Sequence, residues 1–301
     1  MKIIRGINNI KRFKKPVVAL GVFDGVHLGH VSILRAAVRR ASSVGVKSVA
    51  LTFDPHPQKE ESLTSLEHRL RLIAEQGIDI CIIINFNKKF KSILAADFIK
   101  DILVKKLEAC YVYVGRNFRF GRNAEGSIRT LEQYSKAYHY NLKVFDVIKI
   151  NHRVISSTFI RNLIKKGDFK TTEKLLLRPV TVLGSVIKGS HLGKKLGFPT
   201  ANINPHHEVI PPEGVYAVKV IFGRNRFNGV CNIGTRPTFS KKGALRIEVH
   251  LFNFHKNIYG RYIEIEFIKK IREEKKFPSA AALAENIKKD ITFARTLFAR
   301  C

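Results

Sequence analysis

In the first half of the chain, short apolar runs alternate with longer amphipathic stretches. The apolar runs predict strands at 17–23, 46–53, 79–85, 110–115 and 142–147. The amphipathic stretches predict helices at 31–43, 65–76, 95–109 and 127–138. Because strands alternate with helices here, we expect a Rossmann-like α/β domain: a parallel sheet with helices on both faces, which binds ligands at the carboxyl ends of its strands.

The pattern changes in the second half of the chain, after two further predicted helices at 157–166 and 168–177. Strand-like stretches then follow one another directly, at 180–187, 214–222, 226–233, 245–253 and 260–270. Turns with glycine or proline separate them, which favours an antiparallel β-barrel. One helix is expected from Ser279 to Asp290, followed by a second helix to the C-terminus. The sequence thus predicts two domains, 1–179 and 180–301, with the boundary near 178–182.

The composition is that of a folded protein, with 301 residues of which 45% are hydrophobic. The longest apolar stretches, such as 78–84, are too short to cross a bilayer. Residues 1–15 are basic and have no hydrophobic core, so we expect no secretory signal. Four scattered cysteines without a Cys-x-x-Cys pair favour a reduced protein in the cytoplasm.

The charge balance is strongly basic, because 54 Lys and Arg face 24 Asp and Glu, a formal net charge of +30. Nucleic acid is the partner that such a charge first suggests. The basic residues are dispersed in pairs such as Lys88-Lys89, however, and form neither a basic tail nor a recognition helix with interleaved aromatic residues. We therefore do not expect specific nucleic-acid binding. A lysine-rich surface spread by coding bias, together with attraction of anionic nucleotides, is the alternative explanation of the charge.

Two histidines, His27 and His30, lie between the first predicted strand and the helix expected from Val31. Backbone N–H groups and the dipole at a helix N-terminus favour a phosphate, and imidazoles add hydrogen-bond donors. Glycines in this turn allow the backbone to approach a ligand closely. No cysteine or acidic cluster nearby completes a metal shell. The expected nucleotide contacts in the turn are Gly21, Phe23, Asp24, Gly25 and Gly29.

Three more polar stretches follow predicted strands or begin a predicted helix in the first half. The stretch 51–57 has prolines that stiffen the turn after the second strand, and 113–121 is a glycine-flanked loop with two phenylalanines. The stretch 155–161 offers three hydroxyl groups at a helix start and an arginine one turn later, which suits a phosphate. The candidate site residues in these stretches are Asp54, His56, Asn117, Arg119, Ser157, Thr158 and Arg161.

All four stretches resemble the adenylyltransferase module of the bacterial bifunctional riboflavin kinase/FMN adenylyltransferase family. The resemblance implies that His27 and His30 stabilise the α-phosphate of ATP while the FMN phosphate attacks and pyrophosphate leaves. It also implies that Ser157, Thr158 and Arg161 hold the departing phosphates. The residues it places around the nucleotide and flavin are Asp54, His56, Asn117 and Arg119.

The first half departs from the family pattern at three positions. Arg116 stands where the family is often acidic, and Phe159 replaces a frequent basic residue. Leu177 stands where a glycine is usual before Arg-Pro. None of these changes removes a residue to which the resemblance gives a catalytic role.

A second glycine-rich stretch, 184–202, is a candidate phosphate site of a different kind. It is not a P-loop, because Gly189 and Gly193 are one residue too close and Lys195 occupies the Ser/Thr position. It offers a loop of glycine and lysine followed by Pro-Thr-Ala-Asn, in which Thr200 and Asn202 point to one side if extended and give two oxygen ligands for Mg²⁺. The phosphate-binding candidates here are Gly189, Lys195, Gly197, Thr200 and Asn202.

A kinase that acts on a hydroxyl group also needs a carboxylate to accept its proton. Glu248 lies between apolar residues in a predicted strand, although an outward-facing strand residue with no special role has the same pattern. The stretch from about 181 to 292 resembles the riboflavin kinase domain, which implies that Glu248 is the base on the ribityl hydroxyl and that Arg272 contacts flavin or phosphate. Asn253 and Asn257 stand where this family usually has aspartates.

The two resemblances together imply an α/β nucleotidyltransferase domain followed by a β-barrel of the six-stranded type with a C-terminal helix. They imply a magnesium-dependent transferase that uses ATP to convert riboflavin to FMN and FMN to FAD, without a membrane partner. Three alternatives stay open: that only one of the two activities is retained, that a nucleotidyltransferase scaffold binds nucleic acid, or that another phosphorylated substrate is activated.

Overall fold

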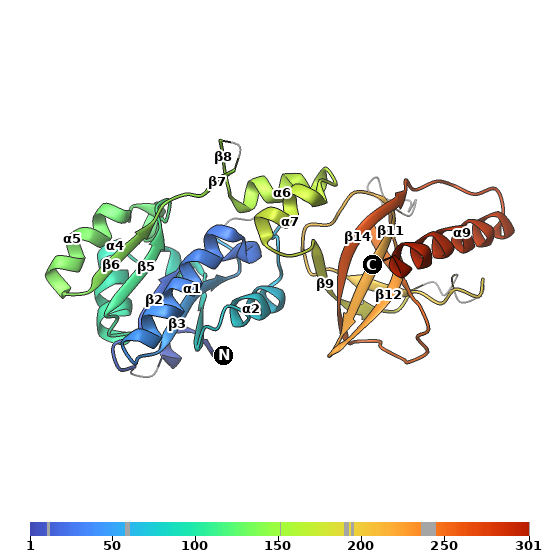
Figure 1. Cartoon of the computed structure of the whole chain (residues 1–301). Coiled ribbons are helices and arrows are strands. Elements are labelled where there is room, and N and C mark those ends of the chain that lie inside the picture. The colour runs from blue at the N-terminus through green and yellow to red at the C-terminus, as the bar shows by residue number, and fades with distance from the viewer. Residues whose placement is uncertain are drawn as a thin grey trace. The chain divides into compact units, whose positions relative to one another are not determined.

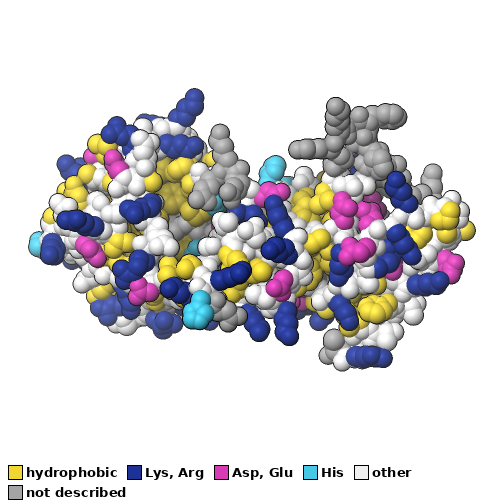
Figure 2. All heavy atoms as spheres, turned by 90° about the horizontal axis from the view of Figure 1, so that it is seen from above, with side chains coloured by type: hydrophobic (Ala, Val, Ile, Leu, Met, Phe, Trp, Pro, Cys, Tyr) yellow, Lys and Arg dark blue, Asp and Glu magenta, His cyan; other side chains and the backbone are white. Residues whose placement is uncertain are grey.

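The computed structural model describes residues 1–10, 13–57, 61–150, 152–189, 193, 196–235 and 245–300. The chain divides into two compact units, Met1–Phe159 and Ile160–Cys301 (Figure 1). Lys and Arg side chains are spread over the visible face of both units and do not gather into one patch (Figure 2). None of the described helices is long and apolar enough to pass through a membrane.

The first unit is built on a six-stranded sheet with the strand order β1-β4-β3-β2-β5-β6. Its strands are β1 (Lys2–Arg5), β2 (Val17–Leu20), β3 (Ser48–Asp54), β4 (Ile80–Asn85), β5 (Tyr111–Gly115) and β6 (Asn141–Phe145). All neighbouring strands are parallel. Because β2 lies between β3 and β5, the strand order reverses there, and such a switch point is where open α/β sheets bind ligands.

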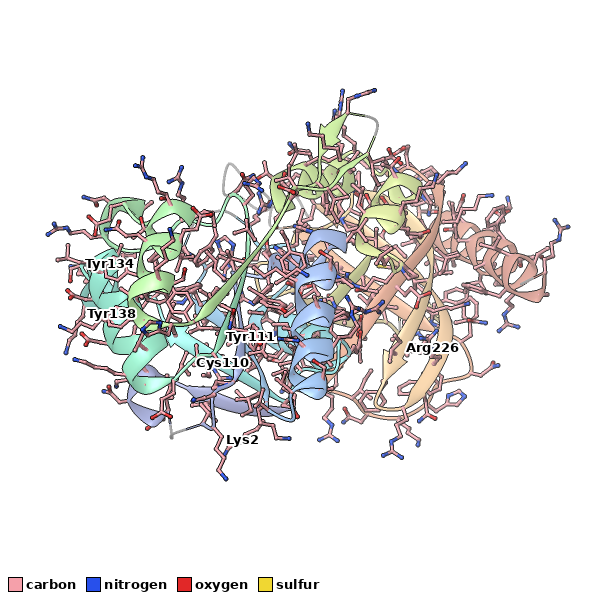
Figure 3. The ribbon with its side chains drawn as sticks, turned by 60° about the vertical axis from the view of Figure 1, so that its left-hand side comes forward. Lys2, Cys110, Tyr111, Tyr134, Tyr138 and Arg226 are labelled. Atoms are coloured by element: carbon pink, nitrogen blue, oxygen red, sulfur yellow. The ribbon has the colours of Figure 1, made fainter. Side chains whose placement is uncertain are left out.

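Helices cover both faces of this sheet, as predicted. They are α1 (Leu28–Ser43), α2 (Leu66–Ala74), α3 (Lys88–Lys91), α4 (Ala95–Asp97), the π-helix η3 (Phe98–Lys106) and α5 (Ile128–Tyr138). Alternate residues of β2 face opposite ways, so that Val17 packs with α1 and α2 while Val18 packs with η3 and α5. Arg40 of α1 lies over the ring of Tyr111 at the start of β5, 4.3 Å from its centroid. Tyr111 is labelled in Figure 3.

Short elements complete this unit: η1 (Ile7–Asn9), η2 (Asp24–Val26), η4 (Arg122–Ala124), β7 (Lys149–Ile150) and β8 (Arg153–Val154). The edge strand β1 was not predicted, because only two apolar residues lie between its charged ends, too few for a periodic pattern. It is held by the parallel pairing of Lys2–Arg5 with β4. The helix expected at 95–109 forms as α4 followed by η3.

The second unit is a closed antiparallel barrel with the strand order β10-β13-β12-β11-β14-β9. The strands are β9 (Thr181–Ile187), β10 (Ala201–Asn204), β11 (Gly214–Phe222), β12 (Asn225–Thr235), β13 (Leu245–Leu251) and β14 (Tyr262–Arg272). The six-stranded barrel implied by the sequence is therefore confirmed. A long C-terminal helix, α9 (Ala280–Ala299), packs Ala294 against Val215, Ala217 and Val230.

The prediction of two separate helices after Ser279 was wrong, because α9 is one helix of 20 residues. Ser279 begins it by accepting a hydrogen bond from the backbone N–H of Ala282. Ile291 and Leu297 pack on the same hydrophobic cluster as Ala294, so a single apolar face continues past Asp290. Packing along the barrel thus extends the helix beyond the point where its sequence pattern weakens.

The two units divide before the predicted boundary near 178–182. Helix α6 (Ser157–Lys165) begins at the end of the first unit, and α7 (Phe169–Leu176) belongs to the second. The ring of Phe169 lies 5.9 Å from that of Tyr216 and 6.1 Å from that of Phe267. These contacts attach α7 to the barrel, although it precedes the predicted barrel sequence.

Candidate active sites

The paired histidines lie where β2 passes into α1, at the switch point of the sheet. His27 is the N-cap residue of α1 and His30 lies in its first turn, because the helix begins at Leu28 and not at Val31. Their rings are stacked, with centroids 3.7 Å apart and planes 20° apart. His27 is only 6% exposed. The structure therefore joins the two predicted imidazoles in one compact group at a helix N-terminus.

The turn before the histidines has an unusual backbone. Phe23 (φ 55°) and Val26 (φ 37°) are left-handed, as is Gly25 (φ 75°), and such conformations are costly for residues with a Cβ. Packing holds them: the ring of Phe23 is fully buried and meets His30 edge-on at 5.4 Å. A Cβ on Gly21 would lie 2.9 Å from the Phe23 ring. Gly21 and Phe23, predicted as nucleotide contacts, thus shape the turn beneath the histidines.

Asp24 fastens this turn to a segment that lies about 40 residues later in the sequence. Its carboxylate, 1% exposed, accepts hydrogen bonds from the backbone N–H groups of Leu63 and Thr64, each at 3.1 Å. The Thr64 hydroxyl accepts the N–H of Gly25 at 3.1 Å. A Cβ on Gly25 would lie 2.5 Å from Leu63. The predicted nucleotide contacts Asp24 and Gly25 are therefore involved in holding the turn in place.

The end of β3 brings the next two predicted residues to the same edge of the sheet. The Nε2 atom of His56 lies 4.0 Å from Oδ2 of Asp24, and its side chain is 13% exposed. Asp54 is more accessible, with 44% of its side chain exposed. Gly29, in the first turn of α1, would place a Cβ 3.3 Å from the His27 ring. Gly29 therefore leaves bare backbone beside the His27 ring.

A residue that the sequence analysis missed lies beneath this group. Arg69 of α2 is 3% exposed and donates hydrogen bonds to the carbonyl groups of Val22 and Phe53, both at 3.1 Å. Burial, the neighbouring His27 and the charge of Arg69 hold the pKa of His30 well below its usual value of 6.5. The sequence pattern of a charged residue in a predicted helix indicates a solvent-facing position, so this contact has no local sign in the sequence.

The loop after β5 presents its polar and aromatic residues alternately. Asn117 and Arg119 are exposed. The rings of Phe118 and Phe120 between them stack at 5.7 Å, and Phe120 belongs to the core. Arg116, one of the departures from the family pattern, forms an ion pair with Asp146. The aromatic pair therefore anchors a loop whose two predicted site residues stay accessible.

The start of α6 is tied to the histidine turn through Ser157. Its hydroxyl donates a hydrogen bond to the backbone carbonyl of Asp24 at 3.1 Å. Thr158 is exposed, and Arg161, one turn further along α6, is buried. The guanidinium of Arg153 lies 5.8 Å from the ring centroid of Phe159. The hydroxyl-bearing helix start thus lies beside the turn that carries His27.

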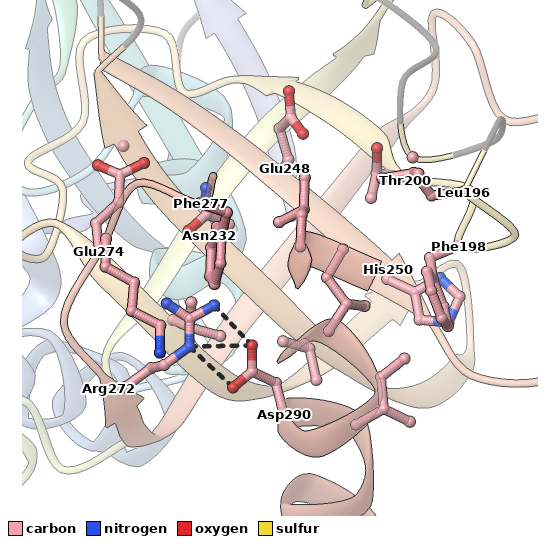
Figure 4. A pocket seen from close by; sticks show the side chains of 18 of the residues that line it. Leu196, Phe198, Thr200, Asn232, Glu248, His250, Arg272, Glu274, Phe277 and Asp290 are labelled. Carbon is pink, nitrogen blue, oxygen red and sulfur yellow. Dashed lines mark hydrogen bonds and ion pairs between the residues drawn. The ribbon is translucent and has the colours of Figure 1, made fainter. Parts of the chain in front are cut away.

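The second unit has a cavity of about 360 Å³ on the outer face of its barrel (Figure 4). Strands β12, β13 and β14, helix α9 and the segments 196–200 and 274–277 contribute to its wall. Among the lining residues are Thr200, Asn232, Glu248, His250, Arg272 and Phe277. Apolar side chains such as Leu283 and Ile287 of α9 and further polar ones such as Glu274 also line it.

Glu248 lies in a polar row that crosses three strands. Asn202 of β10 is paired with Glu248 of β13, which is paired with Asn232 of β12. Directly paired residues point to the same side of a sheet. The neighbours Ile247 and Val249, 1% and 0% exposed, point into the barrel. Glu248 therefore points to the outside of the barrel, where it forms part of the cavity wall.

Gly189, which begins the predicted phosphate-binding stretch, is packed against this row. A Cβ on Gly189 would lie 2.1 Å from the side-chain nitrogen of Asn202, so this amide rests on bare backbone. His250 hydrogen-bonds to the carbonyl of Pro199 at 2.9 Å, which fixes the segment that leads to Thr200. Gly197 is left-handed, with φ 87°. Lys195, also predicted, lies outside the described residues.

Arg272, for which a contact with flavin or phosphate was predicted, lies in the cavity wall and is bonded to helix α9. Its guanidinium donates to both carboxylate oxygens of Asp290, at 3.0 and 2.8 Å, and to the carbonyl of Glu273 at 3.1 Å. It also lies 5.4 Å from the ring centroid of Phe277. With its donors used in this way, Arg272 joins β14 to α9 in the cavity wall. Asp290 was not predicted as a site residue, because nothing in a helix sequence reveals an ion pair with a distant strand.

The two asparagines that replace usual aspartates fit their positions. Asn253 is left-handed, with φ 54°, a conformation that asparagine tolerates well. The side chain of Asn257 accepts a hydrogen bond from the backbone N–H of Tyr259 at 3.1 Å. An amide oxygen can make this bond as a carboxylate does, so the loop does not need the negative charge.

The residues present fit a magnesium ion held mainly by its substrate. No group of three or more His, Cys, Asp or Glu suited to a metal occurs among the described residues. The Thr200 hydroxyl lines the cavity, and the Asn202 amide lies beside Glu248. Oxygen donors of this kind suit Mg²⁺, which keeps several waters and takes its other ligands from phosphates.

An α/β unit with paired imidazoles at its switch point, joined in one chain to a barrel with a carboxylate in its cavity, defines a two-domain transferase. The family model of FAD synthetase matches residues 9–159, and that of riboflavin kinase matches residues 176–298. The chain belongs to the bifunctional riboflavin kinase/FMN adenylyltransferase family. It is a bifunctional riboflavin kinase and FMN adenylyltransferase.

Relatives of that description resemble the chain over nearly its whole length. The protein from Buchnera aphidicola subsp. Schizaphis graminum is 39% identical, with 99% of each chain covered. That from Haemophilus influenzae is 37% identical, again covering 99% of each chain, and that from Escherichia coli K12 is 35% identical, covering 99% of this chain and 98% of the relative. A solved structure from Streptococcus pneumoniae, described as a macrolide-efflux protein, is 27% identical with a TM-score of 0.83, and 98% and 99% of the two chains are covered.

Proposed function

We propose that adenylyl transfer takes place in residues 1–179 and riboflavin phosphorylation in 180–301, with ATP and Mg²⁺ used at both sites. The switch point of the parallel sheet supports the first assignment, because it brings His27 to a helix N-terminus that suits a phosphate. The outward row Asn202–Glu248–Asn232 supports the second. Each site draws on elements of the sheet or barrel in which it lies.

In the proposed adenylyl transfer, an oxygen of the FMN phosphate attacks the α-phosphorus of ATP. The bond to the β-phosphate breaks, and its electron pair leaves with pyrophosphate. His27 and His30 donate hydrogen bonds to the α-phosphate, while Ser157, Thr158 and Arg161 hold the departing phosphates. No covalent intermediate with the protein is needed, since positioning and charge stabilisation account for most of the catalysis in such transfers.

The flavin and nucleotide are held by the loops that surround the histidines. Exposed Asn117 and Arg119 supply hydrogen bonds and a positive charge from the loop after β5. Asp54 and His56 supply polar groups from the end of β3. These loops follow neighbours of β2 in the sheet, so one ligand can contact both of them and α1.

In the proposed kinase reaction, Glu248 accepts the proton of the ribityl hydroxyl while the oxygen of that hydroxyl attacks the γ-phosphorus of ATP. The bond to the β-phosphate breaks and ADP leaves. Thr200 and Asn202 would hold Mg²⁺, which offsets the charge of the phosphates when it is bound. Gly189, Lys195 and Gly197 would surround those phosphates. Phe277 and the apolar face of α9 form a surface on which the flavin ring packs.

The observation that carries the proposal is the position of Glu248 in the wall of a largely apolar cavity, opposite Asn202. The purified chain, incubated with riboflavin, ATP and Mg²⁺, is expected to form FMN first and FAD later, as resolved by chromatography. Omitting Mg²⁺ tests its role, and supplying FMN alone tests the first site separately. Recovery of neither product would refute the proposal.

We also propose that the protein works in the cytoplasm. Cys81 and Cys231 are buried free thiols. Burial raises the pKa of the Cys81 thiol to about 12, so this residue stays protonated and packs as a small hydrophobic group. Free thiols of this kind suit a reducing compartment.

A further inference from the structure

Arg69 connects the ends of two central strands beneath the paired histidines. One of its terminal nitrogens donates to the carbonyl of Val22, just after β2, and the other donates to the carbonyl of Phe53 in β3. The guanidinium is planar and its two bonds have fixed directions. The spacing of the two turns that carry the histidines and Asp54 is therefore set by one side chain of α2.

The charge of Arg69 is permanent and lies in a buried position. Burial lowers its pKa, and Asp24, Asp54, Cys81 and Glu67 partly counteract this effect. Its Nη2 atom lies 4.0 Å from Oδ1 of Asp54. A guanidinium nevertheless remains protonated in proteins. The group thus supplies a positive charge that does not vary with pH.

His30 is the titratable group that this charge influences. It is stacked on His27 at 3.7 Å and is met edge-on by Phe23. Its Nδ1 atom is buried and has no hydrogen-bond partner among the described residues. Burial lowers the pKa of His30 most, and the nearby His27 and Arg69 lower it further. A second positive charge on His30 would be unfavourable in this place.

We propose that Arg69 is a positioning residue of the adenylyl-transfer site, which aligns the turns after β2 and β3 and places a constant positive charge beneath the paired histidines. The proposal rests on the function proposed above for His30. A neutral imidazole offers one donor and one acceptor in fixed positions. The ring in this state donates a hydrogen bond to the α-phosphate, while Arg69 provides the constant positive charge.

This arrangement separates two tasks that a charged histidine would combine. Attraction of the anionic substrate comes from a group that cannot titrate, and the hydrogen bond comes from a group held in one protonation state. Some isomerases keep a histidine neutral beside a developing oxyanion in a comparable way. No proton passes to His30 in this step, because the FMN phosphate is already an anionic nucleophile.

The test compares full-length Arg69→Met and Arg69→Lys with the wild type. Titration of the histidine side chains by NMR is expected to show His30 taking up its proton at a higher pH in Arg69→Met than in the wild type, because a like charge has been removed. Arg69→Lys keeps the charge and should keep the titration of His30, while losing one of the two carbonyl bonds and thus some FAD formation. In Arg69→Met the acid limb of the pH profile for FAD formation should move to higher pH.

Arg71→Met is the matched control, because Arg71 lies two positions along the same helix and is exposed. It removes the same charge and should leave both the titration of His30 and the pH profile unchanged. The proposal is overturned if His30 titrates alike in the wild type and Arg69→Met. If Arg69→Met does not fold, Arg69→Lys decides the question. This variant keeps the positive charge, so a His30 that takes up its proton at higher pH in folded Arg69→Lys than in the wild type overturns the proposal. A wild type that forms no FAD would refute the proposed function, whereas the NMR comparison would still decide the influence of Arg69.

Discussion

Arg272 binds both carboxylate oxygens of Asp290, and this pair joins the last residue of β14 to the middle of α9. Asp290 is 6% exposed, so the pair is largely shielded from water. Leu283 and Ile287, on the N-terminal side of Asp290, line the cavity together with Arg272. The position of the apolar wall of the proposed kinase site therefore depends on this contact.

Asp290→Ala is expected to raise the KM for riboflavin by about tenfold, because α9 loses its anchor while Glu248 stays in place. The unpaired Arg272 should also lower the free energy of unfolding of the barrel by roughly 1.5–3 kcal/mol, the range for hydrogen bonds to charged groups. Steady-state kinetics and thermal unfolding measure the two effects. FAD formation from supplied FMN should be unchanged.

Glu285→Ala is the control for Asp290→Ala on the same helix. Glu285 pairs with Lys289 at 2.7 Å, but both side chains are about two-thirds exposed, at 66% and 68%. Such surface pairs contribute about 0–1 kcal/mol at most. If both variants change the KM for riboflavin equally, helix α9 responds to the loss of any charge. That result would contradict the interpretation that the Arg272–Asp290 pair anchors the helix.

Glu248→Gln is expected to reduce riboflavin phosphorylation by about 10²–10⁴-fold, the usual range for loss of a general base. The amide keeps the shape of the carboxylate but cannot accept the proton. Riboflavin binding, followed by flavin fluorescence, should persist. Glu213→Gln, at an exposed position of the same unit, should be neutral. Loss of FAD formation from FMN in parallel with the kinase activity would contradict the separation into two sites.

His30→Asn should have the opposite selectivity. Loss of one preorganised donor beside a reacting phosphate is expected to lower FAD formation by about 10²–10³-fold. Riboflavin phosphorylation in the same molecules should continue at the wild-type rate. His139→Asn is a suitable control, since His139 is exposed and left-handed, with φ 56°, which asparagine tolerates. FMN should accumulate in assays that start from riboflavin.

The lowered pKa of His30 also predicts how stability depends on pH. The unfolded chain takes up a proton on His30 near pH 6.5, while the folded chain does so only at lower pH. The unfolded state thus binds more protons below pH 6.5, and the first unit loses stability as pH falls, by up to about 1.4 kcal/mol per pH unit until the folded His30 is also protonated. Thermal unfolding at pH 5–8 should show a weaker dependence in His30→Asn. Identical slopes for both proteins would contradict this linkage.

The sequence predicted the architecture of both units and a set of candidate residues for each site. Strands that alternate with helices predict a parallel sheet, whereas strands that follow one another directly predict a barrel. Side chains that follow parallel strands lie at one edge of the sheet, so His27, His56 and Asn117 could be grouped as candidates before the fold was known. The roles of Asp24 and Arg272 were less accessible. Their partners, Leu63, Thr64 and Asp290, lie far away in sequence or on another element, and no local pattern encodes such pairing.

Arg69 and β1 could not be predicted for the same reason, because each depends on contacts with distant parts of the sequence. A buried arginine has the sequence pattern of an exposed one, and only the carbonyl groups of Val22 and Phe53, at the ends of other strands, give it a place in the interior. The strand Lys2–Arg5 is stabilised by pairing with β4 and not by its own composition. Contacts between distant segments determine both features.

Gly25→Ala tests how strictly the histidine turn is packed. Gly25 has φ 75°, and its added Cβ would lie 2.5 Å from Leu63, in the segment that Asp24 holds. The left-handed backbone alone should cost about 1–2 kcal/mol, and the clash in a well-packed site about 1–3 kcal/mol more. Gly45→Ala is the matched control, because Gly45 has φ 67° with nothing within 4 Å of an added Cβ. It should show the backbone cost alone. The difference between the two free energies of unfolding therefore measures the packing of the turn. FAD formation should fall only in Gly25→Ala. Equal losses of stability in both variants would mean that Leu63 moves aside freely and that this contact does not hold the turn.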